Sequence, residues 1–118
     1  MLVVDDDPLI RRFMRDILEE AGFRIVLASN GQEALVYLAS GPPPAVILCD
    51  LAMPVMDGRE FCERKHADAR LAPIPVVVIS GIARMEPDPQ ALNARALFEK
   101  PLPVDYLLTV LHDFCEVR

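Results

Sequence analysis

The sequence has few of the features that mark disulfide-rich, zinc-binding or membrane-spanning proteins. Its three cysteines, Cys49, Cys62 and Cys115, are too few and too scattered for a disulfide framework or a zinc site, so we expect reduced, structural thiols. No apolar run approaches the ~20 residues that are needed to cross a bilayer. The amino terminus, MLVVDDD, turns acidic at once, which is not the pattern of a signal peptide. We therefore expect a soluble, cytoplasmic protein with no membrane partner.

An excess of basic residues is also lacking. Twelve Lys and Arg face eighteen Asp and Glu, which gives a net charge of −6. Contacts with nucleic-acid phosphates require a basic face, so this balance argues against nucleic-acid binding. What is present is ordinary globular composition, 53% hydrophobic and 25% charged over 118 residues, which suits one domain with its own core.

Short apolar segments alternate with helical patterns along the whole chain. The third and fourth apolar segments are apolar at successive positions, which is typical of strands that are covered on both faces. Strict alternation of strand and helix demands right-handed crossovers, and so predicts an α/β fold with a parallel five-stranded sheet and helices on both faces. The expected strands are residues 2–4, 23–28, 45–49, 75–79 and 96–99. The expected helices are residues 8–21, 31–38, 58–67 and 104–117, with a brief helix that begins at Pro89.

Several polar residues are better explained as helix caps than as chemistry. Asp7 precedes the first helical residue, where a carboxylate accepts from free backbone N–H groups, so we favour capping over direct metal ligation. Either Ser29 or Asn30 is expected to cap the second helix. Asp57 precedes a glycine at the next helix start, and we expect it to form a turn and a cap there.

Candidate functional residues follow four of the five expected strands. They are Asp5, Asp6 and Asp7 after the first strand, Asp50 after the third, Ser80 after the fourth and Lys100 after the fifth. In a sheet of this kind the ligand site lies beyond the carboxyl ends of the strands. We therefore expect these residues to share one site.

The residue types at those strand ends suit phosphoryl chemistry. The carboxylates of Asp5 or Asp6 and of Asp50 would lie side by side and repel each other unless a cation neutralised them. Mg²⁺ takes oxygen ligands of this kind. Asp50 is a natural nucleophile because a carboxylate can form an acyl phosphate. Lys100 offers a compact positive charge, and Ser80 a hydroxyl, to a transferred phosphoryl group.

The segments VVDDD, VILCDLAMPVMDG, VVVISG and FEKPL resemble, in the same order, the signature segments of the response-regulator receiver domains (CheY-like) of two-component signal transduction. The resemblance covers essentially the whole chain. It implies one receiver domain at residues 1–118, with a flavodoxin-like (βα)₅ fold and strand order 2-1-3-4-5. It also implies that Asp50 accepts a phosphoryl group from the phosphohistidine of a sensor histidine kinase or phosphotransfer protein. Ser80 would then be the switch hydroxyl, and Lys100 would bind the acyl phosphate.

The same resemblance implies a set of metal ligands. Asp5 and Asp6 would be the acidic pair that holds Mg²⁺, with Asp50 and the backbone carbonyl of Ala52 as the further protein ligands. Such a domain is not an enzyme in the usual sense but a phosphoacceptor that assists its own phosphorylation and dephosphorylation. The resemblance names no output protein or output domain.

Two departures from the family pattern concern the output surface. Receivers usually carry an aromatic residue three positions before the lysine, but here that residue is Leu97, and Phe98 follows it on the opposite face of the strand. The stretch before Lys100 is also short and holds Pro87 and Pro89. A brief helix there offers little surface for dimerisation, so we expect a monomer.

Two rival functions would use some of the same residues. A small Mg²⁺-dependent phosphohydrolase would employ Asp5 and Asp7 as nucleophile and acid, but it would leave Asp50 unexplained. A receiver that has lost phosphorylation would only bind partners, yet the residues that the chemistry needs are all present.

Overall fold

The computed structural model describes residues 1–80, 94–99 and 104–115 of the chain. The strands are β1 (Leu2–Val4), β2 (Val26–Ala28), β3 (Ile47–Asp50), β4 (Val76–Ser80) and β5 (Ala96–Glu99). The helices of the described residues are α1 (Pro8–Glu20), α2 (Gly31–Ser40), α3 (Gly58–Ala67) and α4 (Val104–Cys115). Each agrees with an expected element to within a few residues. The brief helix expected from Pro89 lies outside the described residues.

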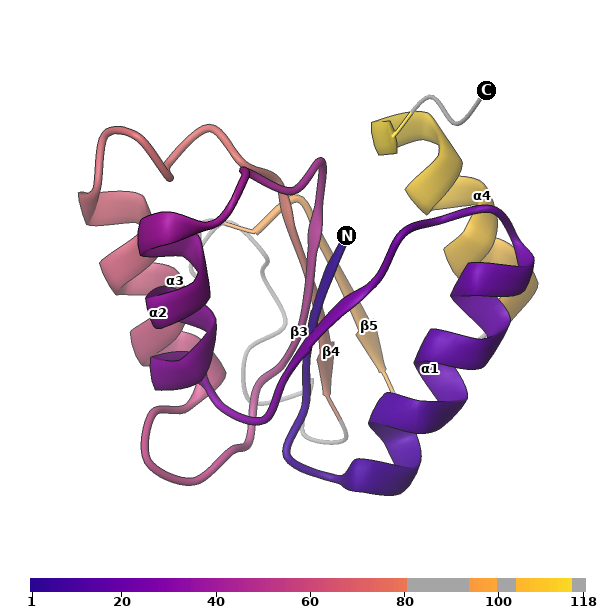
Figure 1. Cartoon of the computed structure of the whole chain (residues 1–118), viewed down its shortest axis with the longest axis horizontal. Helices are drawn as coiled ribbons and strands as arrows, with labels where there is room; N and C mark the ends of the chain where they lie inside the picture. Colours follow the sequence, from indigo (N-terminus) through magenta and orange to yellow (C-terminus); the bar gives the residue numbers. More distant parts are fainter. Residues whose placement is uncertain (81–93, 100–103, 116–118) are drawn as a thin grey trace.

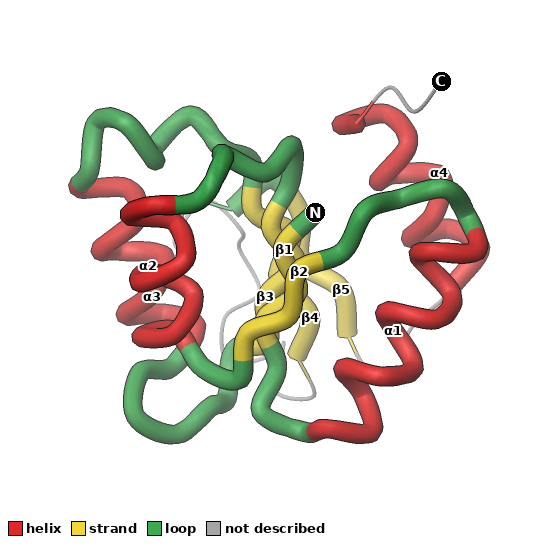
Figure 2. The backbone as a smooth tube through the Cα atoms, in the orientation of Figure 1, coloured by secondary structure: helices red, strands yellow, loops and turns green. Residues whose placement is uncertain are grey.

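All five strands are parallel and form one sheet in the order β2-β1-β3-β4-β5 (Figure 2). Helices α2 and α3 cover one face of the sheet, and α1 and α4 cover the other (Figure 1). This is the predicted doubly wound fold. The strand order reverses between β1 and β3, where sheets of this kind hold their ligands.

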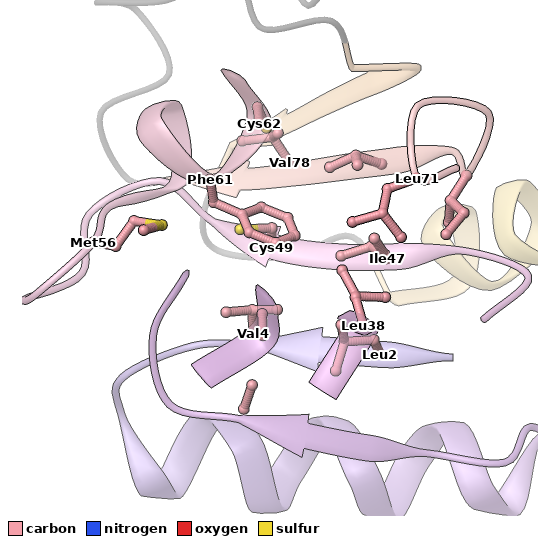
Figure 3. Packing of buried hydrophobic residues seen from close by; sticks show 14 of the residues in the cluster. Leu2, Val4, Leu38, Ile47, Cys49, Met56, Phe61, Cys62, Leu71 and Val78 are labelled. Carbon is pink, nitrogen blue, oxygen red and sulfur yellow. The ribbon is translucent and has the colours of Figure 1, made fainter. Parts of the chain in front are cut away.

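The sheet separates two apolar cores, and β3 contributes to both. Ile47 and Cys49 point into the core beneath α2 and α3, where they pack near Phe61 (Figure 3). Leu48 points the other way, into the core beneath α1 and α4. Every residue of β3 is buried, which explains why its sequence is apolar at successive positions.

Helices α1 and α3 begin at carboxylate caps. The Asp7 Oδ1 atom accepts the backbone N–H of Leu9 at 2.9 Å, and Pro8 occupies the first turn, where its missing N–H costs nothing. The Asp57 Oδ1 atom accepts the N–H of Glu60 at 2.9 Å. Both capping predictions are confirmed.

A reciprocal cap starts α2. The Asn30 Oδ1 atom accepts the N–H of Glu33 at 2.8 Å, and the Glu33 carboxylate accepts both the backbone N–H and the hydroxyl of Ser29. Of the two residues expected as alternatives, Asn30 is the cap. The bonds from Ser29, the residue before the cap, to the Glu33 carboxylate complete this reciprocal arrangement.

Two expectations from composition can be compared with the structure. Cys49 and Cys62 are buried free thiols, as predicted; the side chain of Cys115 lies outside the described residues. Among the helices described, none has the length and apolar character to span a membrane.

Candidate functional site

Three carboxylates meet at the carboxyl edge of the sheet. β1 pairs with β3 in a register that places Val4 opposite Cys49, so the residues that follow, Asp5 and Asp50, are neighbours. One carboxylate oxygen from each of Asp5, Asp6 and Asp50 lies within 4.8 Å of the others. Asp5 and Asp50 are buried, with 5% and 6% of their surface exposed, whereas Asp6 is exposed. The structure therefore brings together the three aspartates expected to bind metal.

The Asp50 side chain is oriented by the backbone that follows it. Its Oδ1 atom accepts the N–H of Leu51 at 2.9 Å. Ala52 comes next in the same loop and is exposed. That its carbonyl oxygen is a metal ligand stays a prediction.

Asp5 is held at each of its polar groups. Its N–H donates to the carbonyl of Ala28 at 3.1 Å, and its Oδ1 atom accepts the N–H of Asp7 at 2.9 Å. Its carbonyl oxygen accepts from Nη1 of Arg11 at 2.7 Å. Reasoning from the sequence missed Arg11. The available signal was a long basic side chain one turn into the helix, because helical side chains lean back toward the N-terminus.

The other two predicted residues follow neighbouring strands. Ser80 is the last residue of β4 and is paired with Glu99, the last residue of β5. Lys100 comes next in the chain. The topology thus brings the ends of β1, β3, β4 and β5 to one edge, but the side chain of Ser80 and the whole of Lys100 lie outside the described residues.

The donor set fits Mg²⁺. Hard carboxylate oxygens, two from buried residues and one from an exposed residue, can supply a few ligands to an octahedral ion while water and phosphate oxygens supply the rest. Asp7 is not one of the three aspartates. Its carboxylate caps α1 instead, so the Asp5–Asp7 pair that a phosphohydrolase would need is divided between two tasks.

An apolar cavity of about 330 Å³ adjoins Asp5 and Asp50 between the sheet and α1. Its walls include Ile10, Met14 and Ile79. Such a wall lowers the local dielectric constant, which strengthens the attraction of the carboxylates for a cation.

Cys49, which precedes Asp50, is buried in the core under α2 and α3. Burial chiefly, and then the charges of Cys62 and Asp50, raise the pKa of the Cys49 thiol well above its usual value. A thiol in this state is protonated and unreactive at neutral pH.

The last strand presents Leu97 and Phe98 to opposite faces of the sheet, as predicted. Leu97 packs against the core under α2 and α3, whereas Phe98 is buried under α1 and α4. The ring of Phe98 meets that of Tyr106 edge-on, with centroids 5.6 Å apart. Tyr106 is 62% exposed, so an aromatic side chain lies at this surface even though residue 97 is leucine.

A parallel sheet of order 2-1-3-4-5 with acidic groups at the ends of its first and third strands defines a receiver-type α/β domain. The chain belongs to the response regulator receiver domain family, whose model matches residues 1–112. It is the receiver domain of a two-component system.

Curated relatives carry the same domain within longer chains. A protein-glutamate methylesterase/protein-glutamine glutaminase of Hahella chejuensis is 40% identical over 87% of this chain and 30% of its own length. Response regulator Rre1 of Synechocystis is 32% identical over 96% of this chain and 50% of its own length. The chain thus spans half or less of these two relatives.

Solved structures agree with the fold. The receiver domain of a signal transduction histidine kinase from Syntrophus aciditrophicus is 27% identical, with a TM-score of 0.89, covering 98% of this chain and 88% of that one. The response regulator TrrA of Thermotoga maritima, solved in complex with Mg²⁺ and BeF, is 26% identical, with a TM-score of 0.84 and 96% of each chain covered.

Proposed function

We propose that Asp50 accepts a phosphoryl group from the phosphohistidine of a sensor histidine kinase or of a phosphotransfer protein. The observation that carries this proposal is a buried carboxylate at the end of β3 with two further carboxylates within 4.8 Å. We take residues 1–118 as a single receiver domain that works as a phosphoacceptor and not as an enzyme with a separate substrate.

In the proposed reaction an Asp50 carboxylate oxygen attacks phosphorus as the bond from phosphorus to the histidine nitrogen breaks. The imidazole leaves with the electrons of that bond and is protonated by solvent, and Asp50 becomes an acyl phosphate. The N–H of Leu51, bound to Oδ1, fixes the plane of the attacking carboxylate. Such transfers depend mainly on positioning and on neutralising charge. Ser80 and Lys100 are proposed to contact the phosphoryl oxygens.

Asp5, Asp6, Asp50 and the Ala52 carbonyl would hold Mg²⁺, with water and phosphoryl oxygens completing the coordination. When bound, the ion supplies charge neutralisation for the carboxylates and the incoming phosphoryl group. This assignment is supported by the grouping of the three aspartates and by the TrrA structure, which contains Mg²⁺.

The partners beyond the phosphodonor are proposed from the relatives and from the charge of the chain. One relative is a DNA-binding regulator, which this chain matches over 45% of that protein's length. A net charge of −6 favours a domain that does not itself contact nucleic acid.

We also propose that the protein is cytoplasmic and stays monomeric when phosphorylated. Sedimentation of its beryllofluoride complex tests the monomeric state. The signal would then pass through loops near Ser80.

Labelling with acetyl phosphate tests the phosphoacceptor. We expect one phosphoryl group per chain by intact-mass spectrometry, only when Mg²⁺ is present, and none on Asp50→Asn. The matched control is Asp57→Asn, which also removes one carboxylate from the same loop region but retains a capping side chain. It should label like wild type. Undiminished labelling of the Asp50 variant would falsify the assignment.

A further inference from the structure

Asp6 is exposed, yet a metal site requires its carboxylate in a defined place. The residues on either side of Asp6 hold its backbone in place. The N–H of Asp7 is bound to the Asp5 carboxylate at 2.9 Å, and the Asp7 side chain is bound to the start of α1. Asp6 is therefore the middle residue of a short loop whose two flanking residues are held in place.

Arg11 holds this loop from the helix side. Its backbone N–H donates to the Asp7 carbonyl at 3.0 Å, and its Nη1 atom donates to the Asp5 carbonyl at 2.7 Å. The Asp5 carbonyl belongs to the peptide unit that leads into Asp6. Because that unit is planar, fixing its oxygen also fixes the bond from which Asp6 projects.

The acceptor that Arg11 uses on Asp5 is the carbonyl oxygen. A guanidinium commonly pairs with carboxylates through two parallel hydrogen bonds. By binding the carbonyl oxygen, this contact leaves the carboxylate oxygens of Asp5 to other partners. Arg11 can thus stiffen the loop without taking a metal ligand.

We infer that Arg11 is a positioning residue for the metal site, which sets the Asp5–Asp6 peptide in the orientation that Mg²⁺ needs. This inference rests on the Mg²⁺ site proposed above. Mg²⁺ demands near-ideal octahedral geometry, whereas Ca²⁺ accepts irregular coordination at longer distances. Loss of the contact between Arg11 and the Asp5 carbonyl should therefore weaken Mg²⁺ binding more than Ca²⁺ binding.

Arg11 could act on the site through its charge or by positioning the loop, and the two predict opposite effects on Mg²⁺ affinity when the guanidinium is removed. A positive charge close to a cation site repels the cation, so removing it should tighten binding if charge alone mattered. If Arg11 positions the loop, removing it should weaken binding. Arg12 is the matched control because it lies on the same turn of α1 and is exposed, so Arg12→Met removes the same charge without this contact.

The test measures Mg²⁺ and Ca²⁺ dissociation constants by calorimetry for wild type, Arg11→Met, Arg11→Lys and Arg12→Met. For Arg11→Met we expect Mg²⁺ to bind about tenfold more weakly, the low end for residues that support metal ligands. Ca²⁺ binding should weaken less, and Arg11→Lys should recover part of the lost Mg²⁺ affinity. Arg12→Met should bind Mg²⁺ like wild type or slightly more tightly.

Tighter or unchanged Mg²⁺ binding by Arg11→Met would overturn the inference, as would an equal loss for Mg²⁺ and Ca²⁺. The ratio of the Mg²⁺ dissociation constant to the Ca²⁺ dissociation constant is independent of how much of the variant is folded, because both ions bind the same folded form. If wild type itself binds no Mg²⁺, or if Asp6→Asn binds it as well as wild type does, the proposed metal site fails instead.

Discussion

The α-carbon of Gly58 packs directly against the main chain of Asp50. A β-carbon at Gly58 would lie 2.4 Å from the Asp50 carbonyl oxygen and 2.8 Å from the α-carbon of Leu51. The Gly58 N–H also donates to the Leu51 carbonyl at 2.8 Å. The start of α3 therefore supports the backbone that carries the proposed phosphoacceptor, and only glycine allows so close an approach.

Gly58→Ala should destabilise the fold and disturb the site. The added methyl group meets backbone atoms, which cannot rotate away, so we expect the free energy of unfolding to fall by about 2–3 kcal/mol. Urea unfolding measures this, and labelling by acetyl phosphate should slow in the folded variant. Glu63→Ala, at an exposed position of α3, is the control and should change stability little. Equal stability of the two variants would mean that the contact is not tight in solution.

Asp50→Asn should stabilise the metal-free protein by about 1 kcal/mol, because one of three neighbouring like charges is removed. Mg²⁺ at a hundred times its dissociation constant should add about 2.7 kcal/mol to the wild type. At the same Mg²⁺ concentration the variant should gain much less. Urea curves with and without Mg²⁺ measure both effects, and Asp57→Asn should behave like wild type. A wild-type curve that ignores Mg²⁺ would contradict the metal site.

Much of the site could be predicted because it depends on strand ends. Asp50 directly follows an apolar run, and parallel strands end at the same edge, so topology alone places it beside Asp5. The bounds of β2 could not be predicted in the same way. Its neighbour β1 offers only Leu2–Val4, so pairing begins at Val26 although the apolar pattern begins at Phe23. Phe23 is buried without being in a strand, and its ring lies 5.0 Å from that of His112.

Contacts that long side chains make with distant loops could not be predicted from the sequence. Lys65 stands in a charged stretch of α3, yet it is 2% exposed and donates to the Ala72 carbonyl at 2.9 Å. Burial lowers the pKa of its ammonium group. Its environment depends on how the segment after α3 folds back, which no local pattern encodes. Arg11 differs from Lys65, because its contact with Asp5 spans only six residues and its place one turn into α1 was a usable signal.

Val55, in the segment between β3 and α3, offers a simple test of backbone strain. It has a φ of 69° and is 81% exposed, so it buries little surface to offset an unfavourable conformation for a β-branched residue. Val55→Asn should raise the free energy of unfolding by about 1 kcal/mol, because asparagine tolerates this conformation. Val55→Ala keeps the positive φ and should gain less. Urea unfolding of the three proteins measures the order, and a less stable asparagine variant would contradict the strain.

Alkaline pH should destabilise the protein through its buried thiols. Burial raises the pKa of Cys62 from 9.0 to about 11, although the charges of Lys65 and Arg59 act to lower it. A group whose pKa is higher in the folded state stabilises that state fully below its unfolded pKa. The contribution of Cys62 is therefore intact below pH 9.0 and is lost as the pH rises toward about 11. Cys49 acts in the same direction.

Cys62→Ala should flatten this alkaline loss of stability. Two pKa units correspond to at most about 3 kcal/mol between the neutral plateau and the end of the titration. The substitution also leaves a small cavity, but the cost of that cavity is the same at every pH, so the slope and not the absolute value is diagnostic. Lys65 acts in the opposite direction, because its lowered pKa makes its burial less costly as the pH approaches 10.5. Urea midpoints between about pH 8 and pH 11 should fall less steeply in the variant than in the wild type. Parallel curves would show that the Cys62 thiol titrates alike in the folded and unfolded states, and that its burial does not raise its pKa.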